Sequence, residues 1–483
     1  MSTLSKLSIV DHQNTKIIAT LGPACSSTEG LLSLIEAGVD VFRLNFSHGT
    51  HEMHGETVER ILAIKKEYGS NVGILADLQG PKLRVGKMEG DGLEIEKDDI
   101  LTFVNEMCVG NMEKIYMSYP EFARDVKVGE QVLIDDGKLV LEVVETNGAN
   151  TVKLKVLFGG ILSSNKGVNL PDTKISLPSL TSKDLVDLEF ILTLPVHWIA
   201  LSFVRKAQDI KELKKKIADA GHKAKVIAKI EKPEAVARIK EIIKATDAVM
   251  IARGDLGVEV PMEQLPAIQK QIIKRCIQRA KPVIVATQMM ESMITNPSPS
   301  RAEITDVANA VLDGADAVML SGETSVGKHP TKVVQAMNKI IEEAEKHYEM
   351  QNKRPKPNPD SSTFLSDTIC LAAPKIANEV NAKAICGLTV SGYTAFKMSS
   401  YRPNCKIFVF SDQEHMLSTL NMVWGVKCFT YDKFTTTDET IYDVSEILKK
   451  AGKVVPGDII VNTGSMPIQK RFRTNMLKIT VVD

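Results

Sequence analysis

Residues 225–259 read KVIAKIEKPEAVARIKEIIKATDAVMIARGDLGVE and contain two short, β-rich apolar runs on either side of one helical pattern. The first run ends in Lys229 and Glu231, and the second ends in Arg253 and Asp255. A parallel strand buried on both faces is normally apolar throughout, and charges at its end cost desolvation energy unless they are paired. Two carboxylates from adjacent strand ends, beside a lysine, therefore indicate a seat for a hard divalent cation and an anionic substrate.

The same alternation of strand-like and helical patterns runs through roughly the first 350 residues. Helix-length amphipathic segments lie between most of the strand-like runs. Eight βα units are the number that closes a TIM barrel, so we expect a (β/α)8 barrel; a doubly wound sheet is the alternative, but it rarely needs eight such units. The expected strands are 16–20, 39–46, 72–78, 198–203, 225–231, 248–254, 282–287 and 315–322.

The connection between the third and fourth strands is far too long for one helix. Inside it the pattern changes to short alternating strands with turn residues, which predicts a small β-barrel inserted into the larger barrel as a lid. Later in the chain, a charged run rich in Pro and Asn predicts a linker, after which a new α/β pattern begins. The expected boundaries are 1–85 and 178–352 for the barrel, 86–177 for the insert, 353–362 for the linker and 363–483 for a C-terminal α/β domain.

The composition of this 483-residue chain limits the kinds of partner that it would attract. Lys plus Arg and Asp plus Glu both number 60, so the formal net charge of +0 gives no global field that would attract nucleic acid or an anionic membrane. The seven cysteines include no C-x-x-C pair, which is typical of reduced thiols in a cytosol. No signal peptide and no bilayer-spanning apolar run is visible. We therefore expect a cytoplasmic protein without nucleic-acid or membrane partners.

The chemistry of a (β/α)8 barrel lies at the C-terminal ends of its strands. In this chain those ends carry cations, carboxylates and hydroxyls, a mixture that suits a phosphorylated, carboxylated substrate held by a metal and does not suit an apolar ligand. Read in strand order, these residues are Arg43, Asn45, Ser47, Asp77, Arg84, Lys229, Glu231, Arg253, Asp255, Thr287, Ser321 and Glu323.

At this point the chain resembles the pyruvate kinase family. Any one of the matching segments would be weak, but they follow the family's order over nearly the whole chain, and the expected domain order also fits. The segments are TLGPA (20–24), RLNFSHG (43–49), DLQGPKLR (77–84), NKGVNLP (165–171), AKIEKPE (228–234), ARGDLGVE (252–259), ATQMMESM (286–293) and LSGETSVGKHP (320–330).

The resemblance implies transfer of phosphate from phosphoenolpyruvate to ADP, giving pyruvate and ATP in the last step of glycolysis. Such a reaction depends on positioning and charge neutralisation more than on covalent chemistry. Glu231 and Asp255 would hold Mg²⁺, with Mn²⁺ as a substitute, and Lys229 would lie over the transferring phosphoryl group and the developing enolate. Arg43 would clamp phosphate oxygens.

Further roles follow from the same resemblance. The backbone at Gly254 and Asp255, together with Thr287, would bind the substrate carboxylate. Thr287, Ser321 and Glu323 could each belong to the relay that delivers a proton to the enolate, and the sequence does not rank them. The residues implied on the nucleotide side are Arg84, Lys166 of the closing lid, Asn45 and His48.

Lys82 is a more particular feature. Members of the family often carry an acidic residue at this position, together with a K⁺ ion. The resemblance implies that Asn45, Ser47, Asp77 and the carbonyl of Leu78 are the equivalents of the K⁺ ligands. Because a lysine ammonium can supply the charge that the ion would bring, we expect an enzyme that does not require K⁺.

The C-terminal domain raises the question of regulation. Thr389, Ser391, Gly392 and Thr394 lie between an expected strand and helix, where they could cradle a phosphate or simply cap the helix without a ligand. In the family this region binds sugar-phosphate effectors. The family is usually tetrameric, and the helical pattern at 366–380 could form an interface.

Two clusters invite a metal-site interpretation that we do not favour. His48, His51 and His54 are better explained as a loop followed by a helix start. Asp135 and Asp136, with the glycine that follows them, favour a tight hairpin turn over a second metal site.

Two other functions remain as alternatives. A Mg²⁺-dependent barrel lyase or aldolase acting on pyruvate-like enolates would use the same carboxylate pair, but it would need neither the lid nor ADP. A metabolite sensor without activity would be expected to have lost a charged strand end, and this chain keeps them.

Overall fold

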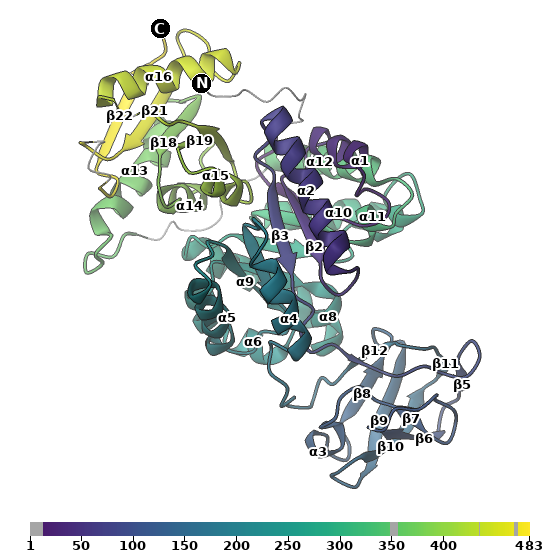
Figure 1. The fold of residues 1–483 in the computed structure, drawn as a ribbon. Helices are drawn as coiled ribbons and strands as arrows, with labels where there is room; N and C mark the ends of the chain where they lie inside the picture. Colours follow the sequence, from purple (N-terminus) through teal and green to yellow (C-terminus); the bar gives the residue numbers. More distant parts are fainter. Residues whose placement is uncertain (1–12, 348–355, 434, 468–471) are drawn as a thin grey trace.

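The chain forms three bodies, and the computed structural model describes residues 13–347, 356–433, 435–467 and 472–483. In Figure 1 the barrel lies in the middle, the inserted domain projects from one end of it, and the C-terminal domain covers the other end. Residues 353–355 of the expected linker lie outside the described residues.

The central body is a closed barrel of parallel strands, as expected from the eight βα units. Around it the strand order is β1-β17-β16-β15-β14-β13-β3-β2. All but the first of the strands end one or two residues earlier than the predicted runs. Their bounds are β1 Lys16–Thr20, β2 Val41–Asn45, β3 Gly73–Asp77, β13 Trp198–Leu201, β14 Lys225–Ile230, β15 Ala248–Ala252, β16 Val283–Ala286 and β17 Ala317–Leu320.

Helices surround this barrel, and several begin with caps that the sequence supplies. Thr50 and Ser300 each accept a hydrogen bond from a backbone N–H of the first turn, and Ser300 does so within a full capping box. The α-helices are α1 Thr28–Glu36, α2 His51–Tyr68, α4 Ser182–Ile191, α5 Ala207–Asp219, α6 Pro233–Ala237, α7 Ile239–Ala245, α8 Arg253–Glu259, α9 Leu265–Gln278, α10 Arg301–Leu312, α11 Gly322–Ser325 and α12 Pro330–Lys346. Two short 3₁₀ helices, Met262–Gln264 and Glu291–Ile294, lie among them.

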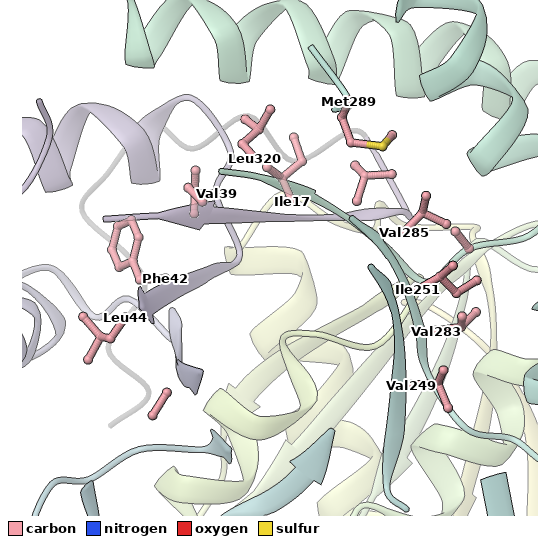
Figure 2. Close-up of a cluster of buried hydrophobic side chains, with 14 of the residues drawn as sticks. Ile17, Val39, Phe42, Leu44, Val249, Ile251, Val283, Val285, Met289 and Leu320 are labelled. Atoms are coloured by element: carbon pink, nitrogen blue, oxygen red, sulfur yellow. The ribbon is translucent and has the colours of Figure 1, made fainter. Parts of the chain in front are cut away.

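Alternation along the strands sorts the apolar side chains into two layers. Side chains such as Ile17, Phe42 and Val285 pack between the strands and the helices, as Figure 2 shows. Their sequence neighbours, such as Ile18 and Ile284, point into the barrel and fill it. Both layers are fully buried, so the barrel is a rigid support for groups at its ends.

The C-terminal domain closes the N-terminal end of the barrel. Met422 of that domain is buried in the interior layer of the barrel, and Trp198 Nε1 donates a hydrogen bond of 3.1 Å to the carbonyl of Thr419. Arg402 reaches in the opposite direction and donates to Asp316 and to the carbonyl of Gly314. Only the C-terminal strand ends are therefore left for a site.

The inserted domain curls into a small barrel, as expected. Its sheet has the order β4-β12-β8-β9-β10-β6-β7, and a bridge between Val85 and Met117 joins the two outer strands. Asp135, Asp136 and Gly137 all have positive φ and form the tight turn between β8 and β9. Its elements are β4 Leu83–Arg84, β5 Leu93–Ile95, β6 Ile100–Val104, β7 Ile115–Tyr116, α3 Phe122–Asp125, β8 Gln131–Ile134, β9 Leu139–Thr146, β10 Thr151–Phe158, β11 Gly160–Leu162 and β12 Gly167–Asn169.

The insert begins slightly before the expected boundary at residue 86. Leu83 and Val85 already pack in its core, because β4 pairs with β12 immediately after the chain leaves the barrel. The return boundary is close to the expected one, since Ile175 still packs in that core and α4 begins at Ser182.

The C-terminal domain is an α/β unit with the strand order β20-β19-β18-β21-β22, in which only β22 is antiparallel to its neighbour. The predicted helix at 366–380 is α13. The elements are α13 Phe364–Glu379, β18 Ala384–Leu388, α14 Tyr393–Ser400, β19 Lys406–Ser411, α15 Glu414–Leu420, β20 Val426–Thr430, α16 Thr437–Lys450, β21 Ile459–Gly464 and β22 Met476–Val481. No helix in the described part of the chain combines the length and the apolar character needed to cross a bilayer.

Candidate active site

An open cavity lies at the C-terminal ends of the barrel strands. It brings together side chains from strands that are far apart in the sequence, because parallel strands all end at the same rim. The predicted site residues that line it are Arg43, Asn45, Ser47, His48, Lys82, Arg84, Lys229, Glu231, Asp255, Thr287 and Ser321.

Lys229 is the centre of this cavity. Its Nζ donates to Ser202 Oγ at 2.7 Å and lies 3.0 Å from Glu231 Oε1 and 3.3 Å from Asp77 Oδ1. Burial acts to lower the pKa of Lys229, but the two carboxylates outweigh burial and raise it to about 12. Lys229 is therefore a fixed positive charge at any physiological pH, with only 12% of its side chain exposed.

Arg43 is held rigidly beside this lysine. Its Nε and Nη2 both lie 2.7 Å from Asp77 Oδ2, and its Nη1 donates to Thr20 Oγ1 at 3.0 Å. Burial would raise the pKa of Asp77, but the charges of Lys229 and Arg43 and their hydrogen bonds lower it. Asp77 thus acts as an ionised anchor that orients two cations towards the cavity.

Glu231 and Asp255 line the same cavity, as the sequence predicts for a metal-binding pair. The other oxygen of Glu231, Oε2, accepts a hydrogen bond of 2.6 Å from the backbone N–H of Phe203. Burial raises the pKa of Glu231, Lys229 opposes this, and the negative charge of Asp255 adds to the rise. A divalent cation shared by the two carboxylates would relieve their repulsion.

The donor set fits Mg²⁺ better than a metal held by the protein alone. Among the residues that the structure describes, no group of three or more His, Cys, Asp or Glu side chains is arranged to hold a metal. Mg²⁺ is commonly bound by one or two carboxylates and completes its coordination with water and substrate oxygens. His48, His51 and His54 also do not form a metal site: His51 pairs with Asp187 at 2.8 Å.

The backbone at Thr287 is strained. Thr287 and Gln288 have φ values of +70° and +54°, which a β-branched residue such as threonine rarely adopts. In this conformation Thr287 Oγ1 accepts a hydrogen bond of 2.7 Å from Gly254 N and donates to the carbonyl of Ala286. The strain places the hydroxyl beside the start of α8, where an anionic group of a substrate could replace it as the acceptor for Gly254 N–H.

Arg253 does not face the cavity, although it ends the same strand. Its guanidinium makes two hydrogen bonds with Asp306, at 2.6 and 2.7 Å, and one with the carbonyl of Thr287. Arg253 therefore supports the loop that carries Thr287.

The structure separates Ser321 from Glu323. Ser321 lines the cavity, whereas the Glu323 carboxylate accepts backbone hydrogen bonds from Met290 and Ser321, at 3.2 and 2.6 Å. Burial raises the pKa of Glu323, and these hydrogen bonds oppose the rise. Glu323 is placed to position the loops around the site, and of the three residues predicted for the proton relay only Thr287 and Ser321 line the cavity.

Among the residues predicted to bind a nucleotide, some line the cavity and Lys166 does not. Arg84 and His48 line the cavity, and burial together with the charges of Arg84, Arg43 and Lys82 lowers the pKa of His48. Lys166 does not line the cavity, because its Nζ is paired with Asp135 at 2.8 Å within the inserted domain.

The residues predicted around a monovalent cation are only partly gathered. Asn45, Ser47 and Lys82 line the cavity, and Lys82 Nζ lies 3.5 Å from Asp255 Oδ1. Asp77 lies behind them with Arg43 and Lys229, as described above. The carbonyl of Leu78 accepts a hydrogen bond of 2.7 Å from Ser202 Oγ.

The loop predicted to hold an effector phosphate begins a helix in the C-terminal domain. Thr389 Oγ1 accepts from Gly392 N at 2.9 Å, and Gly392 has a φ of +77°. Thr394 is paired with Thr474 at 2.9 Å, and Ser391 Oγ lies 3.5 Å from Tyr393 N. Gly392 is the N-cap of α14, and no side chain makes the capping hydrogen bond, so the hydroxyls hold the loop before the helix and its first turn without capping it.

Two functional residues were missed in the sequence. Ser202 bridges Lys229 and the Leu78 carbonyl, and Thr20 holds Arg43. Both are hydroxyl residues directly at or after an apolar strand, at the first and fourth strand ends, from which the sequence analysis took no residue. The same rule that located Thr287 would have found them.

Two family models together match most of this chain. The family models "Pyruvate kinase, barrel domain" and "Pyruvate kinase, alpha/beta domain" match residues 12–334 and 367–480. Among similar proteins, the pyruvate kinase of Corynebacterium glutamicum is 43% identical over 467 residues, which are 97% of each chain. That of Geobacillus stearothermophilus is 41% identical over 476 residues, 97% of this chain and 80% of the relative. A crystal structure of a pyruvate kinase from Cryptosporidium parvum superposes with a TM-score of 0.90 at 35% identity, covering 98% and 97% of the two chains.

Proposed function

The chain belongs to the pyruvate kinase family and is a phosphotransferase, and on that premise we propose a Mg²⁺-dependent transfer of phosphate from phosphoenolpyruvate to ADP at the cavity around Lys229. The observation that carries the proposal is the contact of one buried ammonium group with Glu231, Asp77 and Ser202. A fixed cation next to a pair of metal-binding carboxylates is what a trianionic substrate requires.

The charge of each residue in the cavity decides its proposed role. Glu231 and Asp255 would hold Mg²⁺, which would act as a Lewis acid towards phosphate and enolate oxygens. Lys229 and Arg43 neutralise the transferring phosphoryl group, and because both are held by Asp77 they need no reorganisation during the reaction. Arg84, His48 and Asn45, which line the same cavity, would contact the nucleotide.

Residues that follow β15, β16 and β17 would bind the substrate carboxylate and guide the proton. Gly254 N–H and the Thr287 hydroxyl would bind the substrate carboxylate, exchanging their mutual hydrogen bond for bonds to the ligand. The enolate then needs one proton, and Thr287 and Ser321 are the hydroxyls near enough to lead it there, with Glu323 holding their loops. Lys166 would reach the nucleotide only after leaving Asp135, which links nucleotide binding to movement of the lid.

The function is tested by the initial rate of ATP formation from phosphoenolpyruvate and ADP with Mg²⁺ or Mn²⁺. Formation of both ATP and pyruvate supports the proposal. Release of pyruvate from another substrate without any need for ADP would instead support a barrel lyase or aldolase.

We also propose that the enzyme does not require K⁺. Lys82 places a positive charge in the cavity beside Asn45 and Ser47, 3.5 Å from Asp255. At about 4 Å and an effective dielectric near 20, one charge is worth about 4 kcal/mol, and partial exposure of Lys82 reduces this. Activity in Tris or tetramethylammonium salts is expected to stay within about twofold of that in KCl.

The matched variant is Lys82→Glu, which replaces the ammonium by a carboxylate. It is expected to lose at least about tenfold in activity without K⁺ and to recover part of it in KCl. Strong stimulation of the unmodified enzyme by KCl, or a Lys82→Glu variant indifferent to KCl, would contradict the role of Lys82.

Three broader proposals rest on the family. A sugar phosphate would bind at Thr389, Ser391, Gly392 and Thr394, because the start of α14 has no side-chain cap and its backbone N–H groups could donate to a phosphate. The enzyme would be a homotetramer, with α13 as one candidate interface. A cytoplasmic location is supported by the seven cysteines, all of which are free. Initial rates with a panel of sugar phosphates test the effector site. Light scattering tests the homotetramer.

A further inference from the structure

The short helix α8 contacts both chain segments that connect the barrel to the inserted domain. On the outgoing segment, Lys82 Nζ lies 3.5 Å from Asp255 Oδ1. On the returning segment, Asn169 at the end of β12 donates its Nδ2–H to Glu259 Oε1 at 2.9 Å. Asp255 and Glu259 are four residues apart, so they lie on one face of α8, one turn apart. In Figure 1, α8 lies beside the passage of the chain into the inserted domain.

Glu259 is a buried carboxylate that also reaches back to the metal-binding strand. Lys232 Nζ donates to the same oxygen, Oε1, at 2.6 Å, and the side chains of Lys232 and Glu259 are 7% and 1% exposed. Lys232 follows Glu231 directly. Glu259 Oε2 has no hydrogen-bond partner among the residues that the structure describes. Oε1 of Glu259, at the end of α8, therefore accepts hydrogen bonds both from Lys232, just after β14, and from Asn169 of the insert.

The returning segment contacts both bodies further along. Arg205 of the barrel donates to the carbonyls of Ile175 and Leu177, each at 2.6 Å, while Ile175 packs in the core of the insert and Ser176 N–H donates to Asp125 Oδ2. Rotation of the insert therefore has to change the contact of Asn169 with Glu259 and those of this segment with Arg205. A small cavity lies between the two segments, with Lys82, Asn169 and Glu259 in its lining.

We propose that Asn169, Glu259 and Lys232 form a hinge latch that sets the position of the inserted domain and couples it to the carboxylates of Glu231 and Asp255. These are positioning residues, and the proposal rests on the proposed function only for its kinetic consequence. Rotation of the insert pulls Asn169 against Glu259. Because α8 is only seven residues long, the pull reaches Asp255 at its other end. The free oxygen of Glu259 offers the Asn169 amide a second acceptor as the segment shifts.

The first test compares Asn169→Ala with Asn105→Ala, an exposed asparagine of the insert that does not contact α8. Asn169→Ala removes a hydrogen bond to a buried charge, so hydrogen–deuterium exchange in residues 81–86 and 169–174 is expected to rise about tenfold in the ligand-free protein. Asn105→Ala is expected to leave it unchanged. The KM for ADP, which must contact both bodies, should rise about fivefold or more, while the KM for phosphoenolpyruvate, held by the barrel, should stay within about twofold.

The second test reverses the polarity of the bond. Asn169→Asp sets two carboxylates against one lysine and should be worse than Asn169→Ala. Glu259→Gln leaves Lys232 without its counter-charge. The double variant restores one carboxylate, one amide donor and one lysine, so its exchange and its KM for ADP should return to within about threefold of the unmodified enzyme.

The outcomes separate the latch from the proposed function. Unchanged exchange in Asn169→Ala, parallel changes in both KM values, or single-variant defects that simply multiply in the double variant would each overturn the latch. If the enzyme does not use phosphoenolpyruvate and ADP at all, the kinetic test fails for the unmodified protein, but the exchange measurements still decide whether the latch exists.

Discussion

The Lys229→Met variant is expected to transfer phosphate between about 10³- and 10⁵-fold more slowly than the unmodified enzyme while it still binds Mg²⁺. Lys229 is the cation that contacts Asp77, Glu231 and Ser202 at once, and methionine keeps the length of the chain without its charge. Arg43 cannot take its place, because it is already bound to Asp77 and Thr20. Mg²⁺ binding should persist, since both Glu231 and Asp255 remain.

Loss of stability must be separated from loss of catalysis, because removing Lys229 leaves buried carboxylates without a partner. Lys16→Met is the matched control. Lys16 is fully buried and, like Lys229, is paired with a carboxylate, that of Asp40, but it lies at the opposite end of the barrel. We expect both variants to lower the thermal midpoint and only Lys229→Met to abolish turnover of the folded enzyme. Single-turnover ATP formation and Mg²⁺ titration are the measurements, and turnover by Lys229→Met within about tenfold of normal would remove this lysine from its central role.

Much of the candidate site could be predicted because barrel topology converts sequence order into spatial order. Once a charged residue follows an apolar strand, the parallel arrangement brings it to the same rim as all the others. Arg43, Lys229, Glu231, Asp255 and Thr287 meet in the cavity for this reason. The same topology explains why the interior of the barrel is apolar and why the C-terminal domain closes its other end.

The direction of each side chain could not be predicted, because it depends on partners from distant parts of the chain. Arg253 turns to Asp306, and Lys166 pairs with Asp135. Glu323 turns to backbone N–H groups. In each case the nearest partner with complementary charge or hydrogen bonding decides the orientation, and that partner is known only once the fold is formed.

Backbone strain and domain boundaries were also hidden. The composition of the segment around Thr287 does not predict a positive φ at this β-branched residue. The strained conformation persists because the surrounding hydrogen bonds stabilise it. The insert begins at Leu83 because two residues of β4 pair with β12, and strands that short are below what alternation can detect. The hinge latch depends on β12 in the same way.

The Glu231→Gln variant is expected to raise the Mg²⁺ concentration for half-maximal activity by about 100-fold or more. It removes one of the two carboxylates that line the cavity, and a unit charge at about 4 Å is worth about 4 kcal/mol at an effective dielectric of 20. The amide can still accept the hydrogen bond from Phe203 N, so the local backbone should be retained. The new NH₂ group, however, faces Lys229, another donor, which further weakens the seat of the metal.

Glu323→Gln is the matched control for this variant. Glu323 is also a buried carboxylate that accepts backbone hydrogen bonds beside the cavity, but it does not line it. Glu323→Gln should therefore leave the Mg²⁺ half-saturation within about twofold, even if turnover falls through displacement of Ser321. Titration of activity with MgCl₂ and with MnCl₂ at saturating phosphoenolpyruvate and ADP gives both numbers. An unchanged titration of Glu231→Gln would exclude Glu231 as a ligand, and equal shifts in the two variants would mean that burial of a carboxylate near the rim, and not coordination, controls the metal requirement.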